Sequence, residues 1–446
     1  MFKRILIANR GEIALRILRA CRELGIEAVC VYSTADKDAP YLKLADKAIC
    51  IGPPPARESY LNIARIISAA ETADVDAIHP GYGFLSERAD FAEVCRECKI
   101  EFIGPSPEAM GRLGDKVAAK NTAKAAKVPI FPGSDGAIED ENEAVDVAQR
   151  IGYPVIIKAA AGGGGRGMRV CRNEATLRTS IRAAQQEAQA AFGNGAVFIE
   201  KFLENARHIE IQCLGDKHGH AVHLWERDCS MQRRHQKVIE ESPAPGVDRK
   251  KIAAVAESAA RLLKAAEYHG AATVEFLMDD KQNFYMLEVN TRVQVEHPVT
   301  ELVTGIDIVK MSILTAAGEP IPFKQKDVEL RGHAIECRIN AEDPARNFMP
   351  SAGQITTWHT PGGPGVRLDT HVVPGYRVPP NYDSMIAKLI VHADDRPQAI
   401  DRMARALREF HVAPINTTIP LQSRLMENSS FRQGGIDIHF LERLLK

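Results

Sequence analysis

The densest group of residues able to do chemistry occupies positions 288–298, EVNTRVQVEHP. It follows an apolar run, residues 284–287, that predicts a strand. Because successive side chains of a strand point to opposite faces, every second residue is expected on one face. These residues are Glu288, Asn290 and Arg292, followed by Gln294 and Glu296 if the extended backbone continues. Carboxylates, an amide and a guanidinium on one face are typical of a site for a hard cation and an anion.

A further strand carboxylate precedes this group. Glu275 lies in the apolar run 273–277, and the polar residues 279–283 predict a turn that joins the two runs as a hairpin. Glu275 and Glu288 are then expected side by side. Two carboxylates and an amide oxygen from Asn290 suit Mg²⁺, which prefers oxygen ligands. The alternative is a solvated polar strand face held by salt bridges.

A second polar cluster, residues 226–237, reads ERDCSMQRRHQK. Its cations could bind phosphate or bicarbonate, but a charge run is also typical of a solvated surface. Cys229 within it is expected to be structural rather than nucleophilic. Residues 79–83, HPGYG, predict a structured turn, with a binding role as the less favoured interpretation.

A glycine run, residues 162–165, follows a strand predicted over residues 153–158. The segment 168–171 after it is again extended, which excludes the dinucleotide fingerprint because that motif needs a helix there. Nor is it a Walker A loop, since Met168 follows Gly167. The order favours a flexible hairpin that closes over phosphates, with Lys158 beside it; the alternative is a mobile surface hairpin.

The composition limits the classes of protein. The chain has 446 residues, enough for about three domains, with 45% hydrophobic and 26% charged residues. A net charge of -1 argues against a non-specific nucleic-acid binder. Nine scattered cysteines suit a reducing cytosol. No signal peptide or membrane span is expected, so a cytoplasmic protein without membrane or nucleic-acid partners is predicted.

The pattern of elements predicts three domains. Alternating strands and helices indicate a doubly wound α/β domain over residues 1–114. A second unit over residues 115–330 contains the glycine run and the polar hairpin. Strand-like alternation in 331–338, Gly/Pro-rich turns and a helix over 397–409 indicate an α+β domain over residues 331–446.

The motifs together resemble the biotin carboxylase family of the ATP-grasp superfamily, over essentially the whole chain. They occur in the family's order: residues 7–14 (IANRGEIA), 79–87 (HPGYGFLSE), 114–116 (GDK), Lys158 with its glycine run, 227–230 (RDCS), 288–297 and 336–343 (ECRINAED). A small departure is a run of four glycines where some relatives have five. The resemblance implies an ATP-grasp fold, with the glycine-rich lid over about residues 131–203.

The resemblance also implies the ligands and their residues. ATP would be bound by Lys116, Lys158, Gly164, Gly165, Glu200, Lys201, Leu203, His208, Gln232, His235, Glu275, Leu277, Glu288 and His439. Mg²⁺ or Mn²⁺ would be held by Glu275, Glu288 and Asn290, and bicarbonate by Lys237, Arg292, Gln294 and Val295. Tyr82 and Arg338 would contact biotin, and Arg292, Glu296 and Arg338 would be catalytic.

The mechanism implied by the resemblance begins with Glu296, which deprotonates bicarbonate for attack on the γ-phosphate of ATP. The resulting carboxyphosphate gives CO₂ and phosphate, and the phosphate removes the N1′ proton of biotin. Arg338 then stabilises the enolate oxygen while biotin attacks CO₂. The chain lacks an Ala-Met-Lys-Met biotinylation motif, so biotin is expected on a separate carrier protein.

The resemblance places the chain in a bacterial-type acetyl-CoA carboxylase, as a homodimeric subunit beside a carboxyltransferase, in malonyl-CoA and fatty acid synthesis. Propionyl-CoA, other acyl-CoA and pyruvate carboxylases are alternatives for the acceptor. Another ATP-grasp ligase acting on an amine is a less favoured enzyme. A non-catalytic nucleotide-binding module is disfavoured, because a fold alone does not need this polar set.

Overall fold

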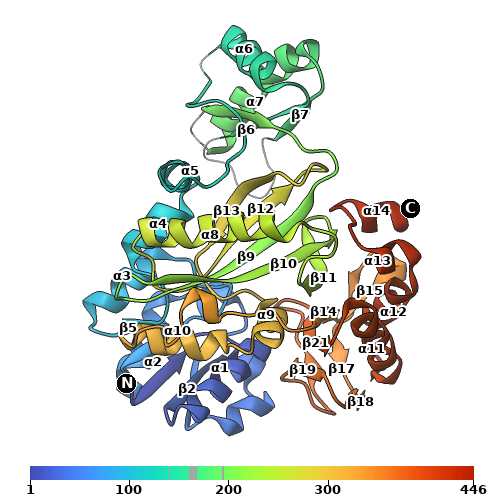
Figure 1. The fold of residues 1–446 in the computed structure, drawn as a ribbon. Helices are drawn as coiled ribbons and strands as arrows, with labels where there is room; N and C mark the ends of the chain where they lie inside the picture. Colours follow the sequence, from blue (N-terminus) through green and yellow to red (C-terminus); the bar gives the residue numbers. More distant parts are fainter. Residues whose placement is uncertain (139, 160–167, 193–194) are drawn as a thin grey trace. The chain divides into compact units, whose positions relative to one another are not determined.

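The computed structural model describes residues 1–138, 140–159, 168–192 and 195–446. These divide into two compact units (Figure 1). The first comprises residues 1–128, 207–276 and 288–446, and the second comprises residues 129–206 and 277–287. No helix among the described residues is both long enough and apolar enough to cross a membrane.

The N-terminal part of the first unit is a five-stranded parallel sheet in the order β3-β2-β1-β4-β5. Its strands are β1 (Arg4–Ile7), β2 (Glu27–Ser33), β3 (Lys47–Gly52), β4 (Ala77–His79) and β5 (Glu101–Phe102), and its helices are α1 (Gly11–Glu23), α2 (Ile63–Ala73), α3 (Ala89–Glu97) and α4 (Pro107–Gly114). Alternate residues of β1 enter two different apolar clusters, Ile5 one and Leu6 the other. Both faces are therefore covered, as in the predicted doubly wound layer.

The centre of the first unit is an eight-stranded sheet in the order β13-β12-β9-β10-β11-β14-β21-β19. The strands are β9 (Arg207–Gly215), β10 (Ala221–Arg233), β11 (Gln236–Ser242), β12 (Gly270–Met278), β13 (Phe284–Asn290), β14 (His333–Asn340), β19 (Val366–Thr370) and β21 (Met385–Ala393). The helices of this region are α5 (Lys116–Ala125), α8 (Arg249–Ala265), α9 (His297–Thr304) and α10 (Ile308–Ala316). The antiparallel pair of β11 with β14 places segments far apart in sequence on one sheet. Strands over residues 270–278 and 284–290 confirm the predicted hairpin.

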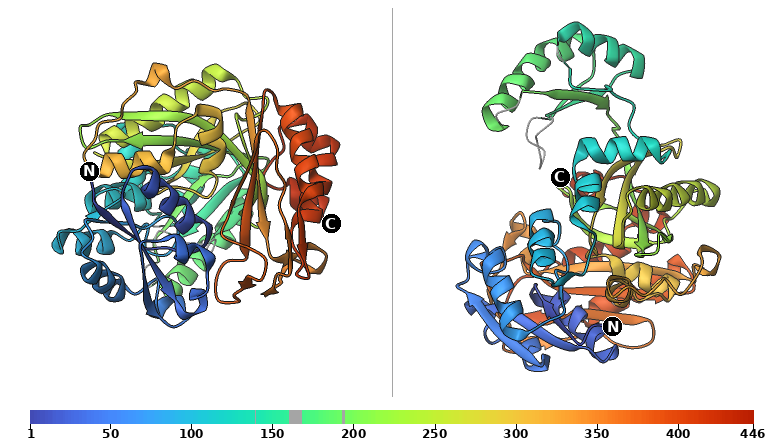
Figure 2. Two further views of the ribbon diagram at one scale, coloured as in Figure 1. Left: turned by 90° about the horizontal axis from the view of Figure 1, so that it is seen from below. Right: turned by 90° about the vertical axis from the view of Figure 1, so that its left-hand side faces the viewer.

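The C-terminal helices cover the end of this sheet. α11 (Arg396–Glu409) contacts β14 and β21, and the red helices lie along these strands in Figure 2. The remaining elements are α12 (Ile419–Glu427), α13 (Ser429–Gln433) and α14 (Phe440–Leu444), with the short pairs β15 (Glu342–Asp343) and β16 (Met349–Pro350), β17 (Gly353–Gln354) and β20 (Arg377–Val378), β18 (Thr357–His359) and β22 (His411–Ala413). Asp395 caps α11 by accepting a hydrogen bond from the Gln398 nitrogen. The predicted helix over 397–409 is confirmed.

The second unit holds a three-stranded antiparallel sheet in the order β7-β6-β8. Its strands are β6 (Val155–Ala159), β7 (Arg169–Cys171) and β8 (Val197–Lys201), and its helices are α6 (Glu141–Ile151) and α7 (Glu174–Phe192). Val155 lies opposite Cys171 across the β6–β7 pair. The predicted order of strand, glycine run and strand is thereby confirmed for the two strands, whereas Gly164 and Gly165 lie outside the described residues.

Candidate active site

The polar cluster in residues 226–237 is buried over most of its length. Arg227 and Cys229 in β10 are fully buried, and Gln232 is nearly so. Arg227 donates hydrogen bonds to Gln212 (2.7 Å) and Gln294 (2.6 Å). The interpretation of this run as solvated surface is therefore wrong for residues 226–232, which are buried although their sequence is polar, whereas residues 234–236 in the following turn are exposed. Burial raises the pKa of the Cys229 thiol well above its ordinary value, which agrees with a structural role.

Lys237 at the start of β11 brings three carboxylates together. Its Nζ donates to Glu296 Oε1 at 2.6 Å, to Glu275 Oε1 at 3.2 Å and to Glu210 Oε1. Burial alone would lower the pKa of this ammonium, but the three carboxylates raise it well above its ordinary value. The site therefore contains a positive charge held by three carboxylates, on a side chain that is 14% exposed.

Glu296 reaches this site from a turn and not from a strand. β13 ends at Asn290, and Glu296 has a non-extended backbone (φ -82°, ψ 10°) immediately before α9. The condition that the extended backbone continues to residue 296 is therefore not met. Burial alone would raise the pKa of Glu296, but Lys237 and Arg338 lower it below its ordinary value. An ionised carboxylate beside two cations is able to act as a base.

Arg338 on β14 joins the base to a second buried carboxylate. Its Nη2 donates to Glu296 Oε2 at 2.9 Å, and its Nε donates to Glu240 Oε1 at 2.6 Å. Burial raises the pKa of Glu240 to about 7, although Arg338 opposes this rise. The two acceptors fix the guanidinium, as electrostatic stabilisation of a developing negative charge requires.

Two of the three predicted metal ligands are joined to the same lysine, Glu275 directly and Asn290 through Glu275. Glu275 Oε1 accepts hydrogen bonds from Asn290 Nδ2 (2.7 Å) and Gln294 Nε2 (2.8 Å). Arg292 Nη2 donates to Asn290 Oδ1 at 2.9 Å. Burial alone would raise the pKa of Glu275, but neighbouring cations, led by Lys237, hold it well below its ordinary value. An ionised carboxylate and an amide oxygen fit the donor set of Mg²⁺.

Of the other predicted residues, His208 and Gln232 extend this group. Glu288 is exposed on β13. His208 Nε2 lies 3.0 Å from Glu275 Oε2, and its Nδ1 lies 3.1 Å from Gln232 Nε2. Burial would lower the pKa of His208, but the carboxylates of Glu275 and Glu210 raise it to about 9. His208, Glu210 and Glu275 also place ligand atoms within 4.8 Å of one another.

The turn after β10 carries His235, which is exposed and has a left-handed backbone (φ 64°). The neighbouring Arg234 nitrogen donates to Glu442 Oε1 at 3.1 Å. Glu442 lies in α14, whose N-cap is His439. The structure thus brings the segments of the two predicted nucleotide contacts together. Lys116 begins α5, and the structure describes its backbone but not its side chain.

In the second unit, Lys158 and Glu200 form one pair of predicted ATP residues. Lys158 Nζ lies 2.6 Å from Glu200 Oε2 across the β6–β8 pair. Lys201 instead donates to the backbone carbonyls of residues 152 and 153, at 3.0 and 2.9 Å. Leu203 and Leu277 are half-buried in this unit.

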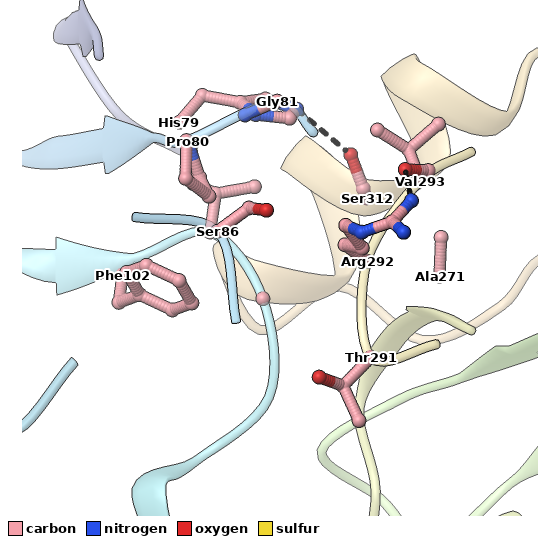
Figure 3. Close-up of a pocket in the computed structure, with 12 residues that line it drawn as sticks. His79, Pro80, Gly81, Ser86, Phe102, Ala271, Thr291, Arg292, Val293 and Ser312 are labelled. Atoms are coloured by element: carbon pink, nitrogen blue, oxygen red, sulfur yellow. Dashed lines mark hydrogen bonds between the residues drawn. The ribbon is translucent and has the colours of Figure 1, made fainter. Parts of the chain in front are cut away.

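The turn predicted at residues 79–83 lines a small cavity of about 10 Å³, shown in Figure 3. His79 Nε2 lies 3.3 Å from Ser312 Oγ, and Arg292 lines the same cavity. Burial lowers the pKa of His79 to about 3, so its imidazole is neutral. The turn is held by Asn9, whose Nδ2 donates to the carbonyls of residues 80 and 82 at 2.7 and 2.8 Å. Asn9 therefore fixes the turn that forms one wall of this cavity.

Sequence reasoning missed several charged residues of this region. Glu210 contacts Lys237, and Glu240 contacts Arg338. Lys388 and Glu336 are fully buried on neighbouring strands. The available signal was a single charged residue within an apolar strand run, as in residues 385–393, MIAKLIVHA.

Comparison with known proteins identifies the family. Three family profiles match in order: the N-terminal domain of biotin carboxylase (residues 1–110), the ATP-binding domain of the carbamoyl-phosphate synthase L chain (115–324) and the C-terminal domain of biotin carboxylase (336–443). A biotin carboxylase of Allochromatium vinosum is 57% identical, with 100% of this chain and 99% of that protein covered.

Two solved structures are similar over the whole chain. A biotin carboxylase–β,γ-ATP complex from Campylobacter jejuni is 52% identical with a TM-score of 0.93, and 99% of each chain is covered. The biotin carboxylase domain dimer of Hydrogenobacter thermophilus 2-oxoglutarate carboxylase, in complex with MgADP, ADP and bicarbonate, is 47% identical. Its TM-score is 0.91, with 99% of this chain and 98% of that chain covered. With the matching domains in the same order, the chain belongs to the biotin carboxylase family of ATP-grasp ligases.

Proposed function

We propose that this enzyme carboxylates biotin on a carrier protein with ATP and bicarbonate, as the first half-reaction of an acetyl-CoA carboxylase. The observation that carries the proposal is the hydrogen-bonded arrangement of Lys237 and Arg338 around the buried Glu296. It combines a base, an anion-binding cation and a fixed guanidinium within one hydrogen-bonded group. On a solvated salt-bridge face these side chains would be largely exposed, whereas here none of the three is more than 19% exposed.

In the first step, bicarbonate is bound by Lys237, Arg292, Gln294 and the backbone of Val295, and Glu296 takes its proton. The bicarbonate oxygen attacks the γ-phosphorus of ATP, the bond to the β-phosphate oxygen breaks, and carboxyphosphate and ADP result. The nucleotide is bound by Lys116, Lys158, Gly164, Gly165, Glu200, Lys201, Leu203, His208, Gln232, His235, Glu275, Leu277, Glu288 and His439. Glu275, Glu288 and Asn290 would hold Mg²⁺, which would neutralise phosphate charge.

In the second step, carboxyphosphate breaks down to CO₂ and phosphate. The phosphate accepts the N1′ proton of biotin, and biotin attacks CO₂ through N1′. Arg338 stabilises the negative charge on the biotin enolate oxygen, and Tyr82 lies on the biotin side of the site. Residues 131–203 act as a lid that excludes water from the reactive intermediate.

The proposed partners are a biotin carboxyl carrier protein and a carboxyltransferase, and the proposed assembly is a cytoplasmic homodimer. The matching domain of H. thermophilus 2-oxoglutarate carboxylase was described as a dimer, which supports the homodimer. The same comparison shows that a related domain belongs to a carboxylase with another acceptor. Acetyl-CoA is favoured here, and malonyl-CoA for fatty acid synthesis is the expected product.

The test is ADP release by the purified enzyme with MgATP and bicarbonate, measured with and without free biotin. Strong stimulation by biotin that disappears without bicarbonate is the expected result. ATP turnover that ignores biotin and responds to an amine would contradict the proposal. Addition of candidate carrier proteins and carboxyltransferases, with acetyl-CoA, propionyl-CoA and pyruvate in parallel, then identifies the acceptor.

A further inference from the structure

A buried lysine lies behind the turn formed by residues 293–296. Lys388 occupies the middle of β21 and is fully buried (0% exposed). Burial alone would lower its pKa, but the carboxylates of Glu12, Glu336 and Asp369 raise it, so the ammonium stays charged. A buried charge costs several kcal/mol unless it is well paired. Its contacts therefore indicate what this residue does.

The Lys388 ammonium donates a hydrogen bond to the Val295 carbonyl at 2.9 Å, across 93 positions of sequence. This carbonyl belongs to the peptide group whose nitrogen is that of Glu296. The carbonyls of Val293 and Gln294 accept hydrogen bonds from neighbours in the same stretch. Lys388 therefore provides a long-range contact that fixes the main chain directly before the base.

The same ammonium contacts the other side of the site. Its Nζ lies 3.1 Å from Glu12 Oε1, and this oxygen also accepts a hydrogen bond from the Tyr82 hydroxyl. In the β14–β21 ladder, Lys388 lies directly opposite Arg338. The Lys388 ammonium is thus connected to the turn that carries Glu296. Through Glu12 it is also connected to Tyr82, the residue assigned to biotin.

We propose that Lys388 is a positioning residue, which holds the Val295–Glu296 peptide in the geometry that bicarbonate needs and links it through Glu12 to Tyr82. The proposal rests on the proposed function, because bicarbonate and biotin are its substrates. Lys388 acts through the main chain and makes no contact with substrate. Its loss should affect bicarbonate first, then biotin, and leave ATP binding unchanged.

The test uses the full-length enzyme and compares Lys388→Met with Lys388→Arg. Lys388→Met keeps the length of the side chain and removes the donor, so KM for bicarbonate should rise about tenfold or more and kcat should fall. Lys388→Arg keeps the charge and should recover part of the loss. KM for ATP should stay within about twofold of wild type in both, since substrate positioning and nucleotide binding are separate contacts.

Arg396→Met is the matched control. Arg396 forms a largely buried ion pair with Glu241, with Nε 2.6 Å from Oε2, and its other hydrogen bonds to described residues are to the carbonyls of Phe431 and Arg432, away from the site. This variant should lower Tm without changing KM for bicarbonate. All constants are normalised to the folded fraction, so a loss of stability is separated from a loss of positioning.

A KM for bicarbonate equal to wild type in Lys388→Met would overturn the proposal, as would a parallel loss for all substrates like that of a destabilised enzyme. If Lys388→Met does not fold, the KM for bicarbonate of Lys388→Arg becomes the test. The larger guanidinium must alter the contact with the Val295 carbonyl, so a wild-type KM in Lys388→Arg would also overturn the proposal. Failure of the proposed function looks different, since wild-type enzyme would then show no ATP turnover dependent on bicarbonate and biotin.

Discussion

Replacement of Arg338 by Ala should abolish most carboxylation and spare nucleotide binding. The guanidinium is fixed by Glu240 and Glu296 at 2.6 and 2.9 Å, so little reorganisation is needed when charge develops on biotin. Two unit charges about 4 Å apart interact by roughly 4 kcal/mol at an effective dielectric constant near 20. Since each 1.4 kcal/mol is tenfold in rate, kcat for carboxybiotin formation should fall by about 10²- to 10³-fold.

The assay is incorporation of labelled bicarbonate into carboxybiotin, with nucleotide binding measured by calorimetry. Loss of one partner of a buried ion pair also costs about 3–5 kcal/mol of stability, so rates are normalised to the folded fraction. Arg338→Lys keeps the charge but does not reproduce the two-pronged contact, and it should retain an intermediate rate. Carboxylation by Arg338→Ala at the wild-type rate would refute the role assigned to this guanidinium.

Three further outcomes are expected. Burial alone would raise the pKa of Glu241, but hydrogen bonds from His333 and Arg396 lower it from its ordinary 4.5 to about 2. The contribution of ionised Glu241 to the stability of the fold is therefore complete above pH 4.5 and is lost as pH falls from about 4.5 to 2. Over this range Tm should fall more steeply in wild type than in Glu241→Gln, and parallel plots of Tm against pH would contradict this. Glu275→Gln should raise the Mg²⁺ concentration for half-maximal ATP turnover at least about tenfold, and an unchanged titration would remove Glu275 from the ligand set. Leu389→Ala, in the fully buried part of β21, should cost about 2–5 kcal/mol of unfolding free energy, measured by urea denaturation, and a cost below 1 kcal/mol would be inconsistent with a packed core there.

The local elements of the fold were predictable from hydrophobic periodicity. The N-terminal alternation of strands and helices, the polar hairpin and the helix over residues 396–409 all follow from the order of apolar and polar residues. The burial of β10 was not predictable, because its charged sequence resembles a solvated strand. Arg227 is buried only because distant residues supply its acceptors, and that pairing is a property of the tertiary structure.

The site was predicted in part for a similar reason. The motif residues Lys237, Glu296 and Arg338 do lie together. Glu296 was placed on the strand face only on the condition that the extended backbone continues, and the period-two spacing of polar residues does not reveal that the strand ends at Asn290. Lys388 was missed because one lysine in an apolar strand has no meaning until its partner carbonyl, 93 residues earlier, is known.

The second unit consists of two separated stretches of chain, residues 129–206 and 277–287. Its apolar cluster draws only on the first stretch, whereas the Phe131 ring stacks on Tyr285 from the second, with centroids 5.2 Å apart. On a ribosome that adds about 5–20 residues per second, the second stretch arrives roughly 4–16 s after the first is complete. During translation the nascent second unit can therefore form its own core early, but it is completed only when residues 277–287 have been synthesised. Its completion is consequently tied to the synthesis of the central sheet.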